Sequence, residues 1–124
     1  MSVEARSTAG RRLLAEHVAD FNAGVRTGEF GPMTARMTDD ARMIFVGVPV
    51  GPFEGRQAIA DAYRREPPDD TLTIIAVREG EGEVVADYAW DRRPGVRAGE
   101  FRLQHDGAQI CSLAVTFADT REGD

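Results

Sequence analysis

The sequence contains no lysine, and all 15 of its basic residues are arginines. A lysine Schiff base and the lysine of a phosphate-binding P-loop are therefore excluded. The single cysteine, Cys111, leaves no intrachain disulfide and no multi-cysteine zinc site. The two histidines lie far apart in the sequence, so we expect neither a metal site nor a cofactor.

Positive charge is also scarce. The chain has 21 acidic residues against 15 basic ones, which gives a formal net charge of -6. Nucleic acids and anionic membrane surfaces are bound by basic faces, so we expect neither as a partner. No apolar run approaches the ~20 residues of a membrane span, and the N-terminal residues lack the apolar stretch of a signal peptide. We therefore expect a cytoplasmic protein.

The 124 residues are enough for one domain, whose core we expect between about residues 13 and 117. Apolar periodicity and breaks rich in glycine, proline or charge divide the chain into elements. The predicted helices span residues 11–26, 30–37 and 57–64. The predicted strands span residues 42–48, 71–79, 83–91, 96–105 and 109–117. A polar turn is predicted at residues 38–40, and a loop or broken edge strand at residues 49–55.

Short links rich in turn residues join the last four predicted strands, at residues 80–82, 92–95 and 106–107. Links of this kind form hairpins, so we expect these strands to be antiparallel. Helices followed by a curved antiparallel sheet define an α+β domain. The concave interior of such a sheet is either a packed core or a pocket.

Side chains alternate between the two faces of each predicted strand. One face collects the aromatic and large aliphatic residues, namely Val84, Ala86, Tyr88, Trp90, Phe101, Leu103, Cys111, Leu113, Val115 and Phe117. Burying one Phe or Leu is worth roughly 1.5–3 kcal/mol, so this face is predicted to line the interior. The opposite face of the last strand carries Ile110, Ser112, Ala114 and Thr116. Its small side chains suit a homodimer formed sheet to sheet.

A helix, FNAG, a short helix, TDDARMIF, PFEGRQAIADAY and four strands follow one another in this order. This order resembles the nuclear-transport-factor-2-like (NTF2-like) superfamily, in its SnoaL-like and ketosteroid-isomerase-like branch. The resemblance covers about residues 13–117, and its most specific pieces are residues 17–24, 39–41 and 52–63. It implies a cone-shaped α+β fold, in which N-terminal helices cover a curved antiparallel sheet.

The resemblance also allows a comparison of functional residues. Ketosteroid isomerases carry an oxyanion-hole tyrosine where this chain has His17, and a general-base aspartate where it has Phe45. Their protonated aspartate corresponds to Gly99, or to Glu100 if the alignment slips by one residue. A supporting tyrosine is kept as Tyr63. Ketosteroid isomerisation needs a carboxylate to move the proton, so we do not expect that activity.

His17 and Tyr63 are the candidate catalytic residues. His17 lies on the apolar stripe of the first helix, where it can act as an acid, a base or a hydrogen-bond donor in a pocket. Tyr63 can donate a hydrogen bond to a ligand oxygen, and we expect it to pair with His17. For each residue the alternative is a structural role in the core. The candidate ligand-binding residues are Phe21, Phe45, Tyr88, Trp90, Phe101, Leu113, Val115 and Phe117.

Two functions compete at this stage. The first is a protein that binds a small hydrophobic molecule, such as a polyketide or a steroid, with or without isomerase- or cyclase-like acid–base catalysis. The second is a non-catalytic dimeric accessory module whose cone is filled. A third alternative is an epoxide hydrolase, because Asp87, Glu100 and Arg102 are similar to the Asp-Arg-Asp set of limonene-type enzymes. Cavity volume separates the first two, since a ligand pocket needs about 300 Å³ or more.

Overall fold

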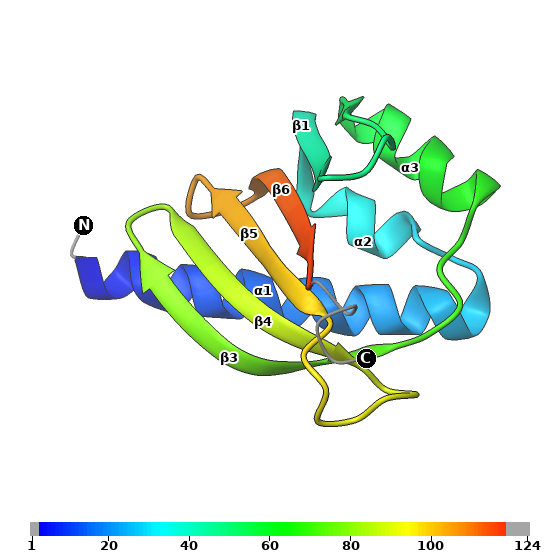
Figure 1. Ribbon diagram of the computed structural model, residues 1–124. Coiled ribbons are helices and arrows are strands. Elements are labelled where there is room, and N and C mark those ends of the chain that lie inside the picture. The colour runs from blue at the N-terminus through cyan, green and yellow to red at the C-terminus, as the bar shows by residue number, and fades with distance from the viewer. Residues whose placement is uncertain (1–2, 119–124) are drawn as a thin grey trace.

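The computed structural model describes residues 3–118, with side chains from residue 9 onward. One long helix, α1 (Val3–Thr27), packs against the strands of a single curved sheet (Figure 1). The other helices are α2 (Gly31–Ala35) and α3 (Arg56–Arg65). The strands are β1 (Met37–Val46), β2 (Phe53–Glu54), β3 (Leu72–Gly80), β4 (Glu83–Trp90), β5 (Gly99–His105) and β6 (Ile110–Phe117). The predicted α+β fold class is confirmed.

The sheet has six strands in the order β2-β1-β6-β5-β4-β3, and it is not closed into a barrel. The strands from β3 to β6 are antiparallel, as the short links predicted. The expectation of a wholly antiparallel sheet is wrong at one pair, because β1 runs parallel to β6. These two strands are far apart in the sequence, so no hairpin dictates their direction.

The predicted polar turn at residues 38–40 is also wrong. β1 already begins at Met37 and continues through these polar residues, with an irregularity in its pairing to β6 between Met37 and Arg42. Thr38, Asp39 and Asp40 reach the surface, so their polarity reflects an exposed strand segment and not a turn. By contrast, the predicted helix at residues 57–64 matches α3 to within one residue at each end.

The FNAG segment has a structural role at the end of α1. The side-chain amide of Asn22 donates to the backbone carbonyl of Leu72 (3.0 Å) and accepts from its N–H (2.9 Å), which fastens α1 to β3. Gly24 leaves room for the ring of Phe30, since a Cβ there would lie 2.5 Å from the ring. This segment therefore positions α1 and α2 over the sheet.

The core lies between the helices and the inner face of the sheet. On β4 and β5 the predicted inner face is confirmed, because Val84, Ala86, Tyr88, Phe101 and Leu103 are buried in one cluster. The pairing between β4 and β5 is regular, so alternation identified their inner face, although Val85 and Ala89 on the opposite face of β4 are buried as well.

On β6 the predicted alternation is wrong at one end. Gln104 pairs with Ser112, but the next residue, His105, pairs with Ile110. Cys111 is thus the extra residue of a β-bulge. Ile110, predicted on the outer face, is completely buried in the core, whereas Cys111, predicted on the inner face, is half-buried. Burial raises the pKa of the Cys111 thiol, which argues against a nucleophile.

Within residues 3–118 none of the helices combines the length and the apolar character that crossing a membrane requires.

Candidate functional site

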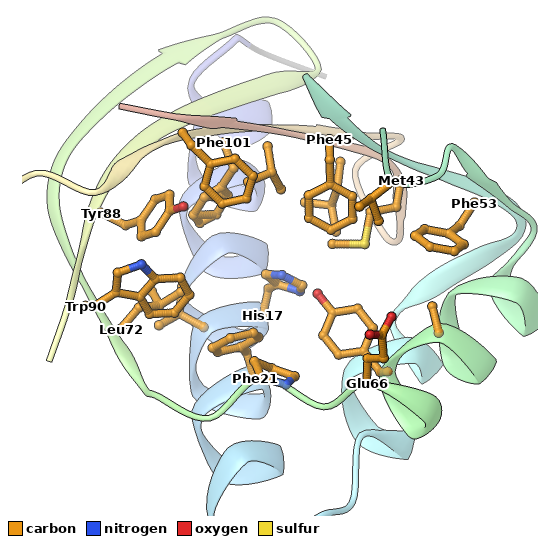
Figure 2. Close-up of a pocket in the computed structure, with 18 residues that line it drawn as sticks. His17, Phe21, Met43, Phe45, Phe53, Glu66, Leu72, Tyr88, Trp90 and Phe101 are labelled. Atoms are coloured by element: carbon orange, nitrogen blue, oxygen red, sulfur yellow. The ribbon is translucent and has the colours of Figure 1, made fainter. Parts of the chain in front are cut away.

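A cavity of about 240 Å³ lies between α1, α3 and the inner face of the sheet (Figure 2). Its lining is mostly apolar and comprises His17, Val18, Phe21, Met43, Phe45, Val50, Phe53, Ala62, Tyr63, Glu66, Pro68, Leu72, Tyr88, Trp90, Phe101, Leu113, Val115 and Phe117. All ten residues predicted for the site are in this lining. Their roles toward a ligand stay predictions.

The volume is below the ~300 Å³ expected of a pocket that encloses a drug-sized ligand. The cavity is open, however, because exposed residues form part of its lining. Val50 and Phe117 are 47% and 42% exposed, and Glu66 is exposed as well. A ligand can therefore fill the closed end and extend past these residues toward solvent.

His17 projects from α1 into this lining (Figure 2). The residue is 6% exposed, and within the part of the chain that the structure describes its Nδ1 has no hydrogen-bond partner. A buried polar atom left without a partner costs about 1–3 kcal/mol. Burial also lowers the pKa of His17 to about 4, an effect that Asp20 opposes and Arg36 adds to. The imidazole is therefore neutral near pH 7 and has a vacant hydrogen-bonding nitrogen.

Tyr63 reaches the same cavity from α3. Its ring packs edge-on against Phe21 (6.4 Å between centroids) and lies 5.1 Å from the ring of Phe30. Burial raises the pKa of the Tyr63 hydroxyl above its ordinary value, so the group stays a hydrogen-bond donor at neutral pH. The predicted hydrogen bond between His17 and Tyr63 is not found among the described residues, although both side chains line the cavity with Phe45.

Aromatic rings form one wall of the cavity. Tyr88 lies edge-on between Trp90 (5.4 Å) and Phe101 (5.8 Å), and Phe21 lies 6.5 Å from Trp90 (Figure 2). Such edge-to-face and tilted contacts hold each ring in a fixed orientation. The wall presents flat apolar surfaces that suit a ring compound.

A second aromatic pair stands near the opening. The rings of Phe45 and Phe117 are parallel to within 5°, with centroids 6.2 Å apart. The resemblance predicts that Phe45 corresponds to the general base of ketosteroid isomerases, and the cavity has a hydrocarbon ring there and not a carboxylate.

The second isomerase carboxylate cannot be restored at Gly99. A Cβ added there would overlap the carbonyl oxygen of Thr116 and would lie 3.0 Å from the Cα of Phe117. No side chain fits without movement of the backbone. Glu100 does not replace it, because this residue forms ion pairs with Arg78 (3.1 Å) and Arg97 (3.4 Å) and is not in the cavity lining.

The epoxide-hydrolase alternative, which needs Asp87, Glu100 and Arg102 in the cavity, is wrong because all three are ion-paired outside it. Asp87 pairs with Arg78 (3.2 Å) and Arg97 (3.1 Å), and Arg102 pairs with Glu83 (3.4 Å). These side chains cover the outer face of β4 and β5, and none of them lines the cavity. The alternation of β4 and β5 puts them on the side opposite Tyr88 and Phe101. They form a surface ion-pair network.

Glu66 is the one charged residue among the eight lining residues that the sequence did not predict. It follows the last residue of α3, and it is the one carboxylate among the lining residues given above. Glu66 stands three residues after Tyr63, at the C-cap of α3, and this spacing was the available signal. The following Pro67 and Pro68 are typical of a helix end and indicate nothing about a cavity. Figure 2 shows Glu66 and Trp90 on opposite sides of the cavity.

In residues 3–118 no group of three or more His, Cys, Asp or Glu side chains is arranged to hold a metal ion. The lining residues of the cavity offer apolar contact and hydrogen bonding, with one carboxylate, Glu66, at the opening.

Comparisons with known proteins bear on the fold. No family model and no curated protein matches the sequence. An NTF2-like protein of unknown function from Burkholderia xenovorans superposes with a TM-score of 0.73 at 16% identity, over 92% of this chain and 86% of that one. A ketosteroid isomerase-like protein from Kribbella flavida gives a TM-score of 0.72 at 15% identity, over 91% and 80%.

A third solved structure contains a ligand. It is a Mycobacterium tuberculosis protein in complex with estradiol-17beta-hemisuccinate, with a TM-score of 0.65 and 14% identity, over 86% of this chain and 92% of that one. Identities this low describe the fold alone. The chain therefore has the fold that NTF2-like, SnoaL-like and ketosteroid isomerase-like proteins share.

Proposed function

We propose that this protein binds a small hydrophobic molecule whose flat part carries a hydroxyl or keto oxygen. The rings of the ligand lie against the aromatic wall of Tyr88, Trp90 and Phe101, and its oxygen lies near His17 and Tyr63. The observation that carries the proposal is the unpartnered, buried Nδ1 of His17 in an otherwise apolar cavity. A ligand group bonded to this nitrogen would offset the cost of leaving it unpaired.

The two polar groups define which oxygens fit. Tyr63 is a donor at neutral pH, so it suits a carbonyl or hydroxyl oxygen. The neutral imidazole of His17 has one nitrogen that accepts and one that donates, so it suits a hydroxyl in either direction. The estradiol derivative bound by the Mycobacterium tuberculosis protein shows that this fold can hold a steroid-like molecule.

Binding is favoured over catalysis. A histidine with a pKa of about 4 is a weak base at neutral pH, and the two positions of the isomerase carboxylates are Phe45 and Gly99. A filled accessory module is the competing function, and it predicts no ligand response. The open cavity argues against it.

Trp90 provides a direct assay, because it is the single tryptophan of the sequence and it lines the cavity. We expect estradiol to change its fluorescence saturably. A ligand at a hundred times its dissociation constant stabilises the fold by about 2.7 kcal/mol, which corresponds to a rise in melting temperature of roughly 10 °C. The absence of both signals with estradiol and with the smaller 2-naphthol would refute the proposal.

His17→Phe tests the assigned polar contact. A lost neutral hydrogen bond is worth roughly 0.5–1.5 kcal/mol, so estradiol should bind about 2- to 10-fold more weakly. The variant should be no less stable than the wild type, since it removes an unpaired buried nitrogen. His105→Gln is the matched control, because His105 is equally buried, at 7% exposed, and lies outside the cavity lining. Loss of stability in His17→Phe with unchanged binding would indicate a structural histidine.

We also propose that the protein is a homodimer through the outer face of β6, at Ser112, Ala114 and Thr116. Small side chains there allow two sheets to approach. The neighbouring outer surface includes Val46, which is 49% exposed and pairs with Thr116. Sedimentation velocity at micromolar concentration should show a dimer that Thr116→Arg dissociates. A cytoplasmic location remains a prediction of the sequence.

A further inference from the structure

We propose that the ligand has an anionic end, which Arg93 and Arg97 bind in a second groove beside the cavity. This groove, here called the arginine groove, has a volume of about 300 Å³ and is lined by Trp90, Arg93, Val96, Arg97 and Phe117, among others. The inference rests on the proposed function, because the apolar end of the same ligand must occupy the cavity.

The two spaces adjoin each other. Trp90 and Phe117 line both the cavity and the arginine groove, so a molecule can pass from one to the other along these rings. The groove also has an apolar side, since Phe117 and Val96 are 42% and 44% exposed. Together the spaces accept a ligand longer than the 240 Å³ cavity holds by itself.

The guanidinium of Arg93 is available to bind an anionic ligand group. Within residues 3–118 no ion pair involves Arg93, whereas the adjacent Arg92 pairs with Asp69 at 3.5 Å. Asp87 and Glu100 are matched in number by Arg78 and Arg97 in their shared network. Arg93 and Arg97 are the charged residues among those that line the groove, so the lining itself carries positive charge.

Arg97 is held by two carboxylates through one of its guanidinium nitrogens, and its other nitrogens can still donate hydrogen bonds to a ligand. Its contacts with Asp87 (3.1 Å) and Glu100 (3.4 Å) both run through Nη2. A guanidinium has further donors on Nε and Nη1, in a fork that matches a carboxylate or a sulfate. A fixed guanidinium beside an unpaired one is a suitable receptor for a single anionic group.

The opening is electrically asymmetric. Glu66 lies on the side of the cavity opposite Trp90 (Figure 2). Arg93 and Arg97 line the arginine groove together with Trp90. An anionic end is repelled by Glu66 and attracted by Arg93. The asymmetry therefore orients an elongated ligand, with its charged end over the β4–β5 link.

A matched pair of probes tests this inference, namely estradiol and estradiol-17β-hemisuccinate, which differ by an acidic tail. Binding is followed by Trp90 fluorescence in low salt. Exposed ion pairs are worth roughly 0.2–1 kcal/mol, so we expect the hemisuccinate to bind about 2- to 5-fold more tightly than estradiol. High salt should remove the difference, because surface charges are screened.

Arg93→Gln should reduce the preference for the hemisuccinate and leave estradiol binding unchanged. Arg92→Gln is the control, since it removes the same charge from the same loop outside both spaces. Arg93 is exposed, so its variant is expected to fold normally. If estradiol binds and the hemisuccinate binds no better, or if Arg93→Gln keeps the full preference, the inference is wrong. If neither probe binds, the proposed function itself fails.

Discussion

The neutral, buried state of His17 makes the stability of the fold depend on pH. The pKa of His17 falls from 6.5 to about 4 on folding, chiefly because burial penalises the charged form. Between these two values the unfolded chain holds more protons than the folded chain, so the free energy of unfolding rises with pH. The contribution of His17 is thus fully present above pH 6.5 and is lost as the pH falls toward 4.

The magnitude follows from the shift. One proton contributes at most about 1.4 kcal/mol per pH unit, so the whole window amounts to about 3 kcal/mol. This is a large fraction of the 5–15 kcal/mol that typically stabilises a domain. Asp20 and Arg36, the charged groups that act on His17, oppose each other and do not remove the effect.

Urea denaturation from pH 7 to pH 4 measures this contribution. Carboxylates also titrate near the lower end, so the informative quantity is the difference between the wild type and His17→Phe. We expect the wild type to lose about 3 kcal/mol more than the variant over this range. His105→Gln serves as the control for the other histidine. Parallel pH profiles for the wild type and His17→Phe would refute the argument that His17 is buried in its neutral form.

Three further predictions concern packing and binding. Gly99→Ala should lower the free energy of unfolding by about 1–3 kcal/mol in urea, because its Cβ overlaps the Thr116 carbonyl; an unchanged midpoint would contradict the tight approach of β5 and β6. Asn22→Ala should cost about 1–3 kcal/mol in the same assay, because the backbone groups of Leu72 lose both bonds, and an unchanged midpoint would contradict the role of Asn22 in fastening α1 to β3. Tyr63→Phe should retain its ring contacts and weaken estradiol about 2- to 10-fold in the fluorescence titration, and equal affinity would remove Tyr63 from the site.

Much of the site could be predicted because it depends on local periodicity. Helical spacing placed His17 and Phe21 on the inner side of α1, and strand alternation placed Tyr88, Trp90 and Phe101 on one face of the sheet. A period of 3.6 or 2 is a property of neighbouring residues, so it can be found in the sequence alone. The resemblance to NTF2-like proteins then indicated that these faces enclose one space.

The place of Glu66 in the cavity lining could not be predicted, because it depends on where α3 ends relative to the cavity. Its proline neighbours indicate the end of the helix, but the direction of the next side chain depends on how α3 packs against β1. The role of Arg93 could not be predicted for a similar reason. A surface arginine becomes part of a groove only through residues distant in the sequence, here Phe117.

The sequence by itself determined the α+β class, the inner face of β4 and β5 and most of the elements, apart from the start of β1 at residues 37–40, because each depends on residues a few positions apart. Tertiary structure alone decided the parallel pairing of β1 with β6, the bulge at Cys111 that turns Ile110 inward, and the volume left open in the cone. These features depend on contacts between segments distant in the sequence. Tertiary structure likewise decided the state of His17, because desolvation is a property of everything that surrounds a side chain and not of its position in a helix.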